Sequence, residues 1–119
     1  MITIFIVDDN DVNLITAEKA LGDFYNVYTL PSAEAMFELL EGITPDLILL
    51  DIKMPEMDGF EAIKILKANP KYISIPVIFL TGKKDDEART TGLELGAVDF
   101  VTKPFDEGEL FRIIMLCTQ

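Results

Sequence analysis

The sequence of 119 residues contains no histidine and a single cysteine, Cys117. Without histidine the chain cannot form Ser-His or Cys-His catalytic pairs, use a histidine general base or bind zinc through imidazole. One cysteine excludes an internal disulfide and a cysteine zinc cluster. Enzyme classes and metal sites that depend on these side chains are therefore excluded.

Positive charge and long apolar runs are also scarce. Lys and Arg number 10 against 21 Asp and Glu, a net charge of -11, which argues against binding nucleic acid because that binding neutralises phosphates with basic side chains. The balance suits a cation or a basic partner. No apolar run approaches the roughly 20 residues that cross a bilayer, and the N-terminus lacks the features of a signal peptide. We expect a cytoplasmic protein without membrane contact.

Length and composition predict one folded domain over residues 1–119. Half of the residues are hydrophobic, which is too many for a disordered segment and enough for one substantial core. Five short apolar segments alternate with five segments of helical periodicity. The strands are predicted at residues 2–7, 27–30, 47–50, 77–80 and 98–101, and the helices at 11–22, 32–42, 58–69, 84–95 and 106–117.

This alternation predicts a single doubly wound α/β domain. Short connections between strands and helices require right-handed crossovers and a parallel sheet covered on both faces.

Two helical segments depart from a simple pattern. Phe24 continues the apolar stripe of the helix at 11–22, so we expect it to face the core. The helix at 84–95 contains Thr90, Thr91 and Gly92, which are poor helix formers, so we expect it to depend on tertiary packing.

Polar residues follow four of the predicted strands directly. Asp8 and Asp9 follow strand 2–7 and Asp51 follows strand 47–50. Thr81 follows strand 77–80, and Lys103 comes two positions after strand 98–101. Ligands and chemistry lie outside the carboxyl ends of parallel strands, and the strand order 2-1-3-4-5 would bring the three carboxylates together.

Three carboxylates in one pocket repel one another unless a cation lies among them, and hard oxygen ligands favour Mg²⁺. A carboxylate beside a metal can attack phosphorus and form an aspartyl-phosphate. Asp51, Lys103 and Thr81 are of the right types to act as nucleophile, ammonium and hydroxyl in that reaction. Each residue alone has a plainer explanation, since acids after strands cap helices and Thr-Gly and Lys-Pro pairs form turns. The combination favours a site.

The motifs IVDDN, LLDIKMPEMDG, FLTG and GAVDFVTKPF resemble those of the response-regulator receiver domain, the phospho-acceptor module of two-component signalling. The similarity extends over essentially the whole chain and implies the flavodoxin-like receiver fold. It implies phosphorelay signalling in which Asp51 accepts a phosphoryl group from a phosphohistidine on a sensor histidine kinase or histidine phosphotransfer protein.

The same resemblance implies roles for the residues around Asp51. Asp9 would bind Mg²⁺ directly, Asp8 directly or through water, and the backbone carbonyl of Lys53 would complete the protein ligands beside Asp51. Lys103 would pair with Asp51 and then with the phosphoryl group, and its bond to Pro104 would be cis.

Thr81 and Phe100 would be the switch residues of the implied receiver. The hydroxyl of Thr81 would move toward the phosphoryl group, and Phe100 would turn inward when it does. Gly82 would leave room for the donor, while Lys53 and Lys83 would add positive charge beside the site. The switching face would contain the helix at 84–95, the strand at 98–101 and the last helix. A homodimer through that face and an output domain after Gln119 are compatible with the resemblance.

Two other functions fit parts of the sequence. A small Mg²⁺-dependent phosphatase with an aspartyl-phosphate intermediate would use a D-x-D motif, which Asp9-Asn10-Asp11 matches, but Asn13 stands where that motif has Thr or Val. A flavodoxin-like cofactor binder would need glycine or a Ser/Thr cluster after the first strand, and none is present. We therefore expect a signalling domain that catalyses only its own phosphoryl transfer and dephosphorylation.

Overall fold

The computed structural model describes residues 1–82 and 86–118, and strands and helices alternate along both ranges. The strands are Thr3–Val7 (β1), Asn26–Leu30 (β2), Leu47–Asp51 (β3), Val77–Thr81 (β4) and Asp99–Thr102 (β5). The helices are Asp11–Leu21 (α1), Ala33–Leu40 (α2), Gly59–Ala68 (α3), Asp86–Leu95 (α4) and Glu107–Cys117 (α5). None of them is long and apolar enough to cross a membrane.

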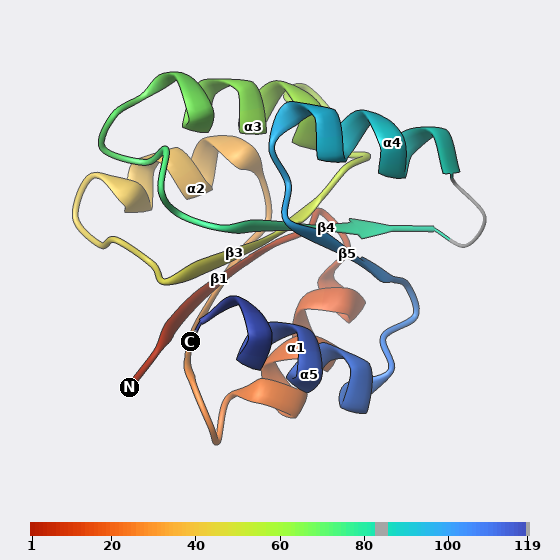
Figure 1. Ribbon diagram of the computed structural model, residues 1–119. Helices are drawn as coiled ribbons and strands as arrows, with labels where there is room; N and C mark the ends of the chain where they lie inside the picture. The colour runs from red at the N-terminus through yellow and green to blue at the C-terminus, as the bar shows by residue number, and fades with distance from the viewer. Residues whose placement is uncertain (83–85, 119) are drawn as a thin grey trace.

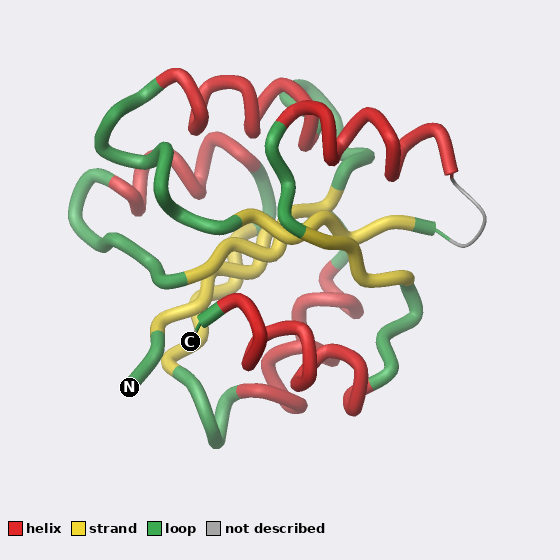
Figure 2. The backbone as a smooth tube through the Cα atoms, in the orientation of Figure 1, coloured by secondary structure: helices red, strands yellow, loops and turns green. Residues whose placement is uncertain are grey.

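The five strands form one parallel sheet in the order β2-β1-β3-β4-β5. Helices α2, α3 and α4 cover one face, and α1 and α5 cover the other (Figure 1). The tube in Figure 2 shows the sheet as the middle of three layers. The doubly wound fold and the strand order predicted from the sequence are confirmed.

The core is divided between the two faces of the sheet because side chains alternate along each strand. Phe5, Ile48 and Phe79 belong to the cluster beneath α2, α3 and α4. Leu49 and Leu80 belong to the cluster that α1 and α5 cover. Every residue of β3 and β4 is buried, which explains why these strands are continuous apolar runs in the sequence.

Helix α4 packs on the sheet through two small residues, Ala88 and Gly92. A Cβ added at Gly92 would lie 2.7 Å from Phe79 Cδ2, closer than real Cβ atoms approach, and 3.2 Å from Phe100 Cε1, which is a tight contact. The glycine that weakens this helix in sequence terms therefore allows it to lie against two aromatic rings. The tertiary packing that we expected α4 to need is therefore a specific contact, between Gly92 and the rings of Phe79 and Phe100. The predicted start of this helix, at 84–85, lies outside the described residues.

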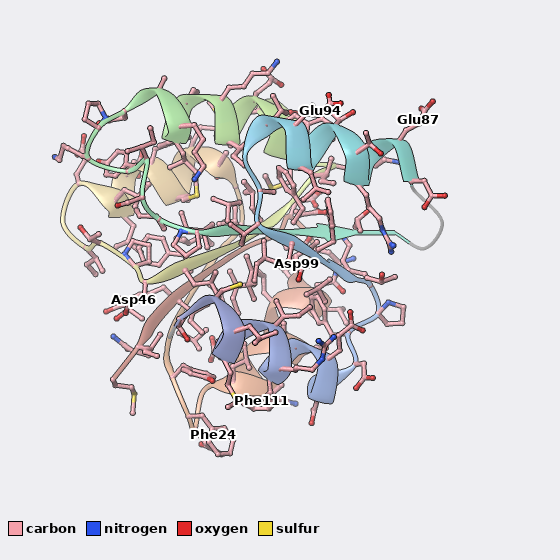
Figure 3. The ribbon with its side chains drawn as sticks, viewed as in Figure 1. Phe24, Asp46, Glu87, Glu94, Asp99 and Phe111 are labelled. Atoms are coloured by element: carbon pink, nitrogen blue, oxygen red, sulfur yellow. The ribbon has the colours of Figure 1, made fainter. Side chains whose placement is uncertain are left out.

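The expectation that Phe24 faces the core is wrong. Helix α1 ends at Leu21, so Phe24 lies in the following turn and no longer follows the helical repeat. Its side chain is 63% exposed. The ring packs edge-on against Phe111 of α5, with 5.2 Å between centroids (Figure 3).

Candidate functional site

The carboxyl edge of the sheet collects the polar residues that follow its strands. Asp8 follows β1, Asp51 ends β3, Thr81 ends β4 and Lys103 follows β5. These strands are neighbours in the sheet, so residues far apart in the sequence meet at one edge. The structure brings together the predicted acids, the lysine and the threonine.

Three carboxylates form the acidic part of this site. Asp8, Asp9 and Asp51 each place one oxygen within 4.8 Å of the others. Asp8 and Asp51 are almost inaccessible, at 0% and 3% exposure, whereas Asp9 is exposed. The site therefore has two carboxylates held inside the protein and one that faces solvent.

Lys103 joins the two buried carboxylates. Its Nζ atom lies 2.9 Å from Asp51 Oδ1 and 3.6 Å from Asp8 Oδ2. The backbone N–H of Lys103 donates to the carbonyl of Thr81 at 2.8 Å, and the Lys103–Pro104 peptide bond is cis. The ammonium is therefore anchored to the end of β4 while its charge faces Asp51.

The ionisation of this pair reflects burial and charge together. The pKa of the Asp51 carboxyl is raised overall to about 6, because burial and the neighbouring Asp8 charge raise it more than the hydrogen bond and charge of Lys103 lower it. Burial lowers the pKa of Lys103, but the hydrogen bond and charge of Asp51, together with the charge of Asp8, outweigh it and raise that pKa. Near neutral pH the site thus holds an ionised Asp51 beside a protonated Lys103.

A pocket of about 260 Å³ opens above Asp51. Lys53, Thr81, Gly82 and Lys103 contribute to its wall. Since one water occupies about 30 Å³ of liquid, the pocket has room for a tetrahedral anion. Thr81 is buried and its hydroxyl lies 3.4 Å from the carbonyl of Gly82. A Cβ at Gly82 would meet no atom of the described residues within 4 Å.

The loop between β3 and α3 keeps the backbone close to Asp51. A Cβ at Gly59 would collide with the Asp51 carbonyl oxygen and lie 2.9 Å from Ile52 Cα, so α3 can begin here only with glycine. Asp58 and Glu61 form the predicted capping box at the start of α3. Lys53 is exposed in this loop.

Comparisons with known proteins agree with this geometry. The sequence model of the response regulator receiver domain matches residues 4–115. The chain belongs to this family. A probable cyclic di-GMP phosphodiesterase of Vibrio cholerae is 47% identical over 102 residues, which are 86% of this chain and 23% of that protein. The response regulator PleD of Caulobacter vibrioides is 38% identical over 98% of this chain and 26% of its own length.

A solved structure shows the same fold. The signal receiver domain of a histidine kinase from Syntrophus aciditrophicus superposes with a TM-score of 0.90 at 32% identity, over 99% of this chain and 90% of that one. The chain spans about a quarter of the length of the two curated relatives. Receiver domains act in two-component signalling with histidine kinases or phosphotransfer proteins, and this membership disfavours the phosphatase alternative.

The acidic edge of this receiver domain has the donor set that Mg²⁺ prefers. Its three carboxylates supply hard oxygen atoms within one small volume. Among the described residues, the exposed Asp9 side chain has no hydrogen-bond or ion-pair partner. The arrangement fits a divalent cation bound at the solvent-facing side of two buried acids.

The two predicted switch residues lie on neighbouring strands, and Phe100 is the one that lies against α4. Phe100 is half-buried on β5, opposite Phe79 in the sheet register and close to Gly92. Thr81 is opposite Thr102 in the same register. Both pairs belong to the neighbouring strands β4 and β5. Lys83, expected near the site, lies outside the described residues.

Sequence reasoning missed two contacts around the site. The amide of Asn13 donates from Nδ2 to Asp8 Oδ2 at 3.0 Å. On the other side, Arg89 Nη2 of α4 donates to Thr102 Oγ1 at 2.8 Å. In the sequence, Asn13 is a polar residue in the first turn of the helix that follows Asp8 and Asp9. A polar residue at such a position usually indicates only helix capping. No signal in the sequence pairs Arg89 with Thr102.

Proposed function

We propose that Asp51 is the phospho-acceptor of this receiver domain and that it takes a phosphoryl group from a phosphohistidine. The observation that carries the proposal is the Asp51–Lys103 contact of 2.9 Å on the floor of a pocket that also contains Thr81 and Gly82. This chain has no histidine, so the donor lies on another chain or domain. A sensor histidine kinase or a histidine phosphotransfer protein would provide it.

In the proposed reaction an ionised oxygen of Asp51 forms a bond to phosphorus. The bond from phosphorus to the imidazole nitrogen breaks, and that nitrogen keeps the electron pair and gains a proton from solvent. With a pKa of about 6, Asp51 is largely ionised at pH 7. The carboxylate is therefore available as a nucleophile at neutral pH.

The other residues of the site position groups and offset charge. Lys103 would transfer its contact from Asp51 to the phosphoryl oxygens, and the Thr81 hydroxyl would donate a hydrogen bond to them. Asp9, Asp51 and the carbonyl of Lys53 would hold Mg²⁺, with Asp8 bound directly or through water. Bound there, Mg²⁺ neutralises charge on the transferring group.

Phosphorylation would be transmitted to the face formed by α4, β5 and α5. Thr81 would move toward the phosphoryl group and Phe100 would turn further inward, by burial alone because Phe100 has no hydroxyl. This face would serve a homodimer or an output domain after Gln119. Glu87 and Glu94 lie on the outer side of α4 (Figure 3), which suits the basic partner that the net charge predicts.

The domain would act in the cytoplasm, would not contact nucleic acid or membrane, and would catalyse only its own phosphoryl transfer and dephosphorylation. Since its curated relatives named above include a response regulator and a probable cyclic di-GMP phosphodiesterase, we infer a regulatory role within a larger regulator.

Phosphorylation by a small-molecule donor tests the assignment. The protein is incubated with acetyl phosphate and Mg²⁺, and its intact mass is measured. We expect one phosphoryl adduct in the wild type and in Asp23→Asn, a control at an exposed turn, and none in Asp51→Asn. An adduct of equal yield in Asp51→Asn would overturn the proposal. Sustained turnover of phosphomonoesters would instead indicate a phosphatase.

A further inference from the structure

The first turn of α1 directs two hydrogen-bond donors at one buried carboxylate. The backbone N–H of Asn10, the N-cap residue, donates to Asp8 Oδ1 at 2.9 Å. The side-chain amide of Asn13 donates to Asp8 Oδ2 at 3.0 Å. Each oxygen of the Asp8 carboxylate therefore has a partner from the same helix start.

This arrangement replaces an ordinary helix cap. In a capping box, the side chain at the third helical position bonds back to the backbone N–H of the N-cap residue. Asn13 occupies that third position, and the Asn10 side chain makes its half of the cap by accepting from Val12 N and Asn13 N. The two groups that would complete the box both bond to Asp8 instead. The helix start is arranged around the carboxylate.

The Asn13 contact restricts how Asp8 can rotate. Lys103 Nζ lies 3.6 Å from the same Oδ2 atom, so Oδ2 faces two donors, one from α1 and one from the residue after β5. Within the described residues Oδ1 has one donor, the Asn10 backbone N–H, and a carboxylate oxygen has about two acceptor positions. Asp8 is thus held in one orientation, and Oδ1 keeps an open acceptor position.

We propose that Asn13 is a positioning residue that fixes Asp8 and makes the acidic site select Mg²⁺ over Ca²⁺. The inference rests on the proposed function of this site. Mg²⁺ requires near-ideal octahedral geometry at about 2.0–2.1 Å, whereas Ca²⁺ accepts 6–8 oxygens in flexible arrangements at about 2.3–2.6 Å. A carboxylate that cannot rotate favours the ion with the stricter geometry.

Asp9 differs from Asp8 in ways that support the proposed role of Asp8 in ion selection. Asp9 is exposed and, within residues 1–82 and 86–118, its side chain has no polar partner. It can adjust to either ion, so it contributes charge without selecting between them. Asp8 is fully buried and held at both oxygens. Discrimination by geometry therefore depends on Asp8 and, through it, on Asn13.

Titration of both ions into unphosphorylated protein tests the proposal. Mg²⁺ and Ca²⁺ dissociation constants are measured by calorimetry for the wild type and for Asn13→Leu, which keeps the side-chain size and removes the donor. Groups that orient metal ligands typically contribute about 10–100-fold to affinity, so we expect a Mg²⁺ loss of about that size and a smaller Ca²⁺ loss. Asn13→Ala, with the best helix former, gives the same comparison if the leucine variant does not fold.

A matched control is Asn26→Leu. The Asn26 amide bonds to Thr3 Oγ1 at the opposite edge of the sheet, so its loss should leave both dissociation constants unchanged. Equal losses for the two ions in the Asn13 variants, or an unchanged Mg²⁺ affinity, would overturn this inference. A wild-type protein that binds no Mg²⁺ would instead overturn the proposed metal site itself.

Discussion

Lys103 Nζ lies 2.9 Å from Asp51 Oδ1, although the two residues are 52 positions apart in the chain. Asp51 ends a central strand and is 3% exposed, so its charge has little contact with solvent. The ammonium offsets that charge, while the neighbouring negative charge of Asp8 opposes the ionisation of Asp51. Stability and chemistry at this edge of the sheet should both depend on the balance between the lysine and the two acids.

Replacing the lysine should reduce phosphoryl transfer strongly. In Lys103→Met no ammonium stabilises the charge that develops on the phosphoryl oxygens, and loss of one such group typically reduces the rate by about 10²–10³-fold. The rate of phosphorylation by acetyl phosphate, followed by intact mass, measures this. Lys64→Met removes an exposed lysine of α3 and should leave the rate unchanged. A Lys103→Met rate close to that of the wild type would contradict the role.

Removing the Asp51 charge should stabilise the domain at neutral pH. The folded-state pKa of about 6 lies above the ordinary aspartate pKa of 3.8, so the folded protein binds this proton more tightly than the unfolded chain. Protonated Asp51 therefore contributes to the free energy of unfolding. This contribution is fully present below about pH 4 and is lost as pH rises through about 6. In the absence of Mg²⁺ we expect Asp51→Asn to raise the free energy of unfolding at about pH 7.5 by on the order of 1–2 kcal/mol.

The pH dependence of the Asp51→Asn stabilisation distinguishes loss of the buried charge from a change in side-chain packing around residue 51. The gain of Asp51→Asn should shrink toward zero below about pH 3, where the wild-type carboxyl is largely protonated in both states. Urea unfolding at several pH values provides the measurement. Asp23→Asn, at an exposed turn, should show little change at any of them. An Asp51→Asn protein less stable than the wild type at neutral pH would show that the Lys103 contact outweighs burial.

Adding one methyl group to α4 should destabilise the domain. Gly92→Ala improves helix propensity by about 1 kcal/mol, but its Cβ would lie 2.7 Å from the buried Phe79 ring, and overpacking costs about 1–3 kcal/mol. We expect a lower thermal midpoint. Gly42→Ala is the matched control because a Cβ there meets nothing within 4 Å. If both variants are equally stable, α4 can move away from the sheet at no cost.

The Arg89–Thr102 hydrogen bond should contribute to holding α4 on β5. Arg89 Nη2 donates to Thr102 Oγ1 at 2.8 Å, and within the described residues the buried Arg89 Nε has no partner. Thr102→Val removes the acceptor and should lower the free energy of unfolding by about 1–2 kcal/mol. Thr91→Val, exposed on the same helix, is the control. A double-mutant cycle with Arg89→Leu should give a coupling energy of at least about 0.5 kcal/mol, and additive effects would show that the contact is not maintained in solution.

Local sequence patterns were sufficient to predict much of the fold. The apolar runs of β3 and β4 predict strands buried on both faces, and Asp58 with Glu61 predicts the capping box that starts α3. These features depend on residues close in sequence, so the sequence contains their physical cause. Phe24 shows the limit of the same reasoning: periodicity predicted a buried residue, but the helix ends three positions earlier and the ring turns outward against Phe111.

The sequence by itself determined which residue types follow each strand, and the parallel doubly wound topology then places Asp8, Asp51, Thr81 and Lys103 at one edge. What only the tertiary structure decided was how these groups pair. The Arg89–Thr102 bond and the approach of Gly92 to Phe79 each join different elements at distances set by packing. Spacing along the chain contains no information about such distances, because they arise when helices settle on both faces of the sheet.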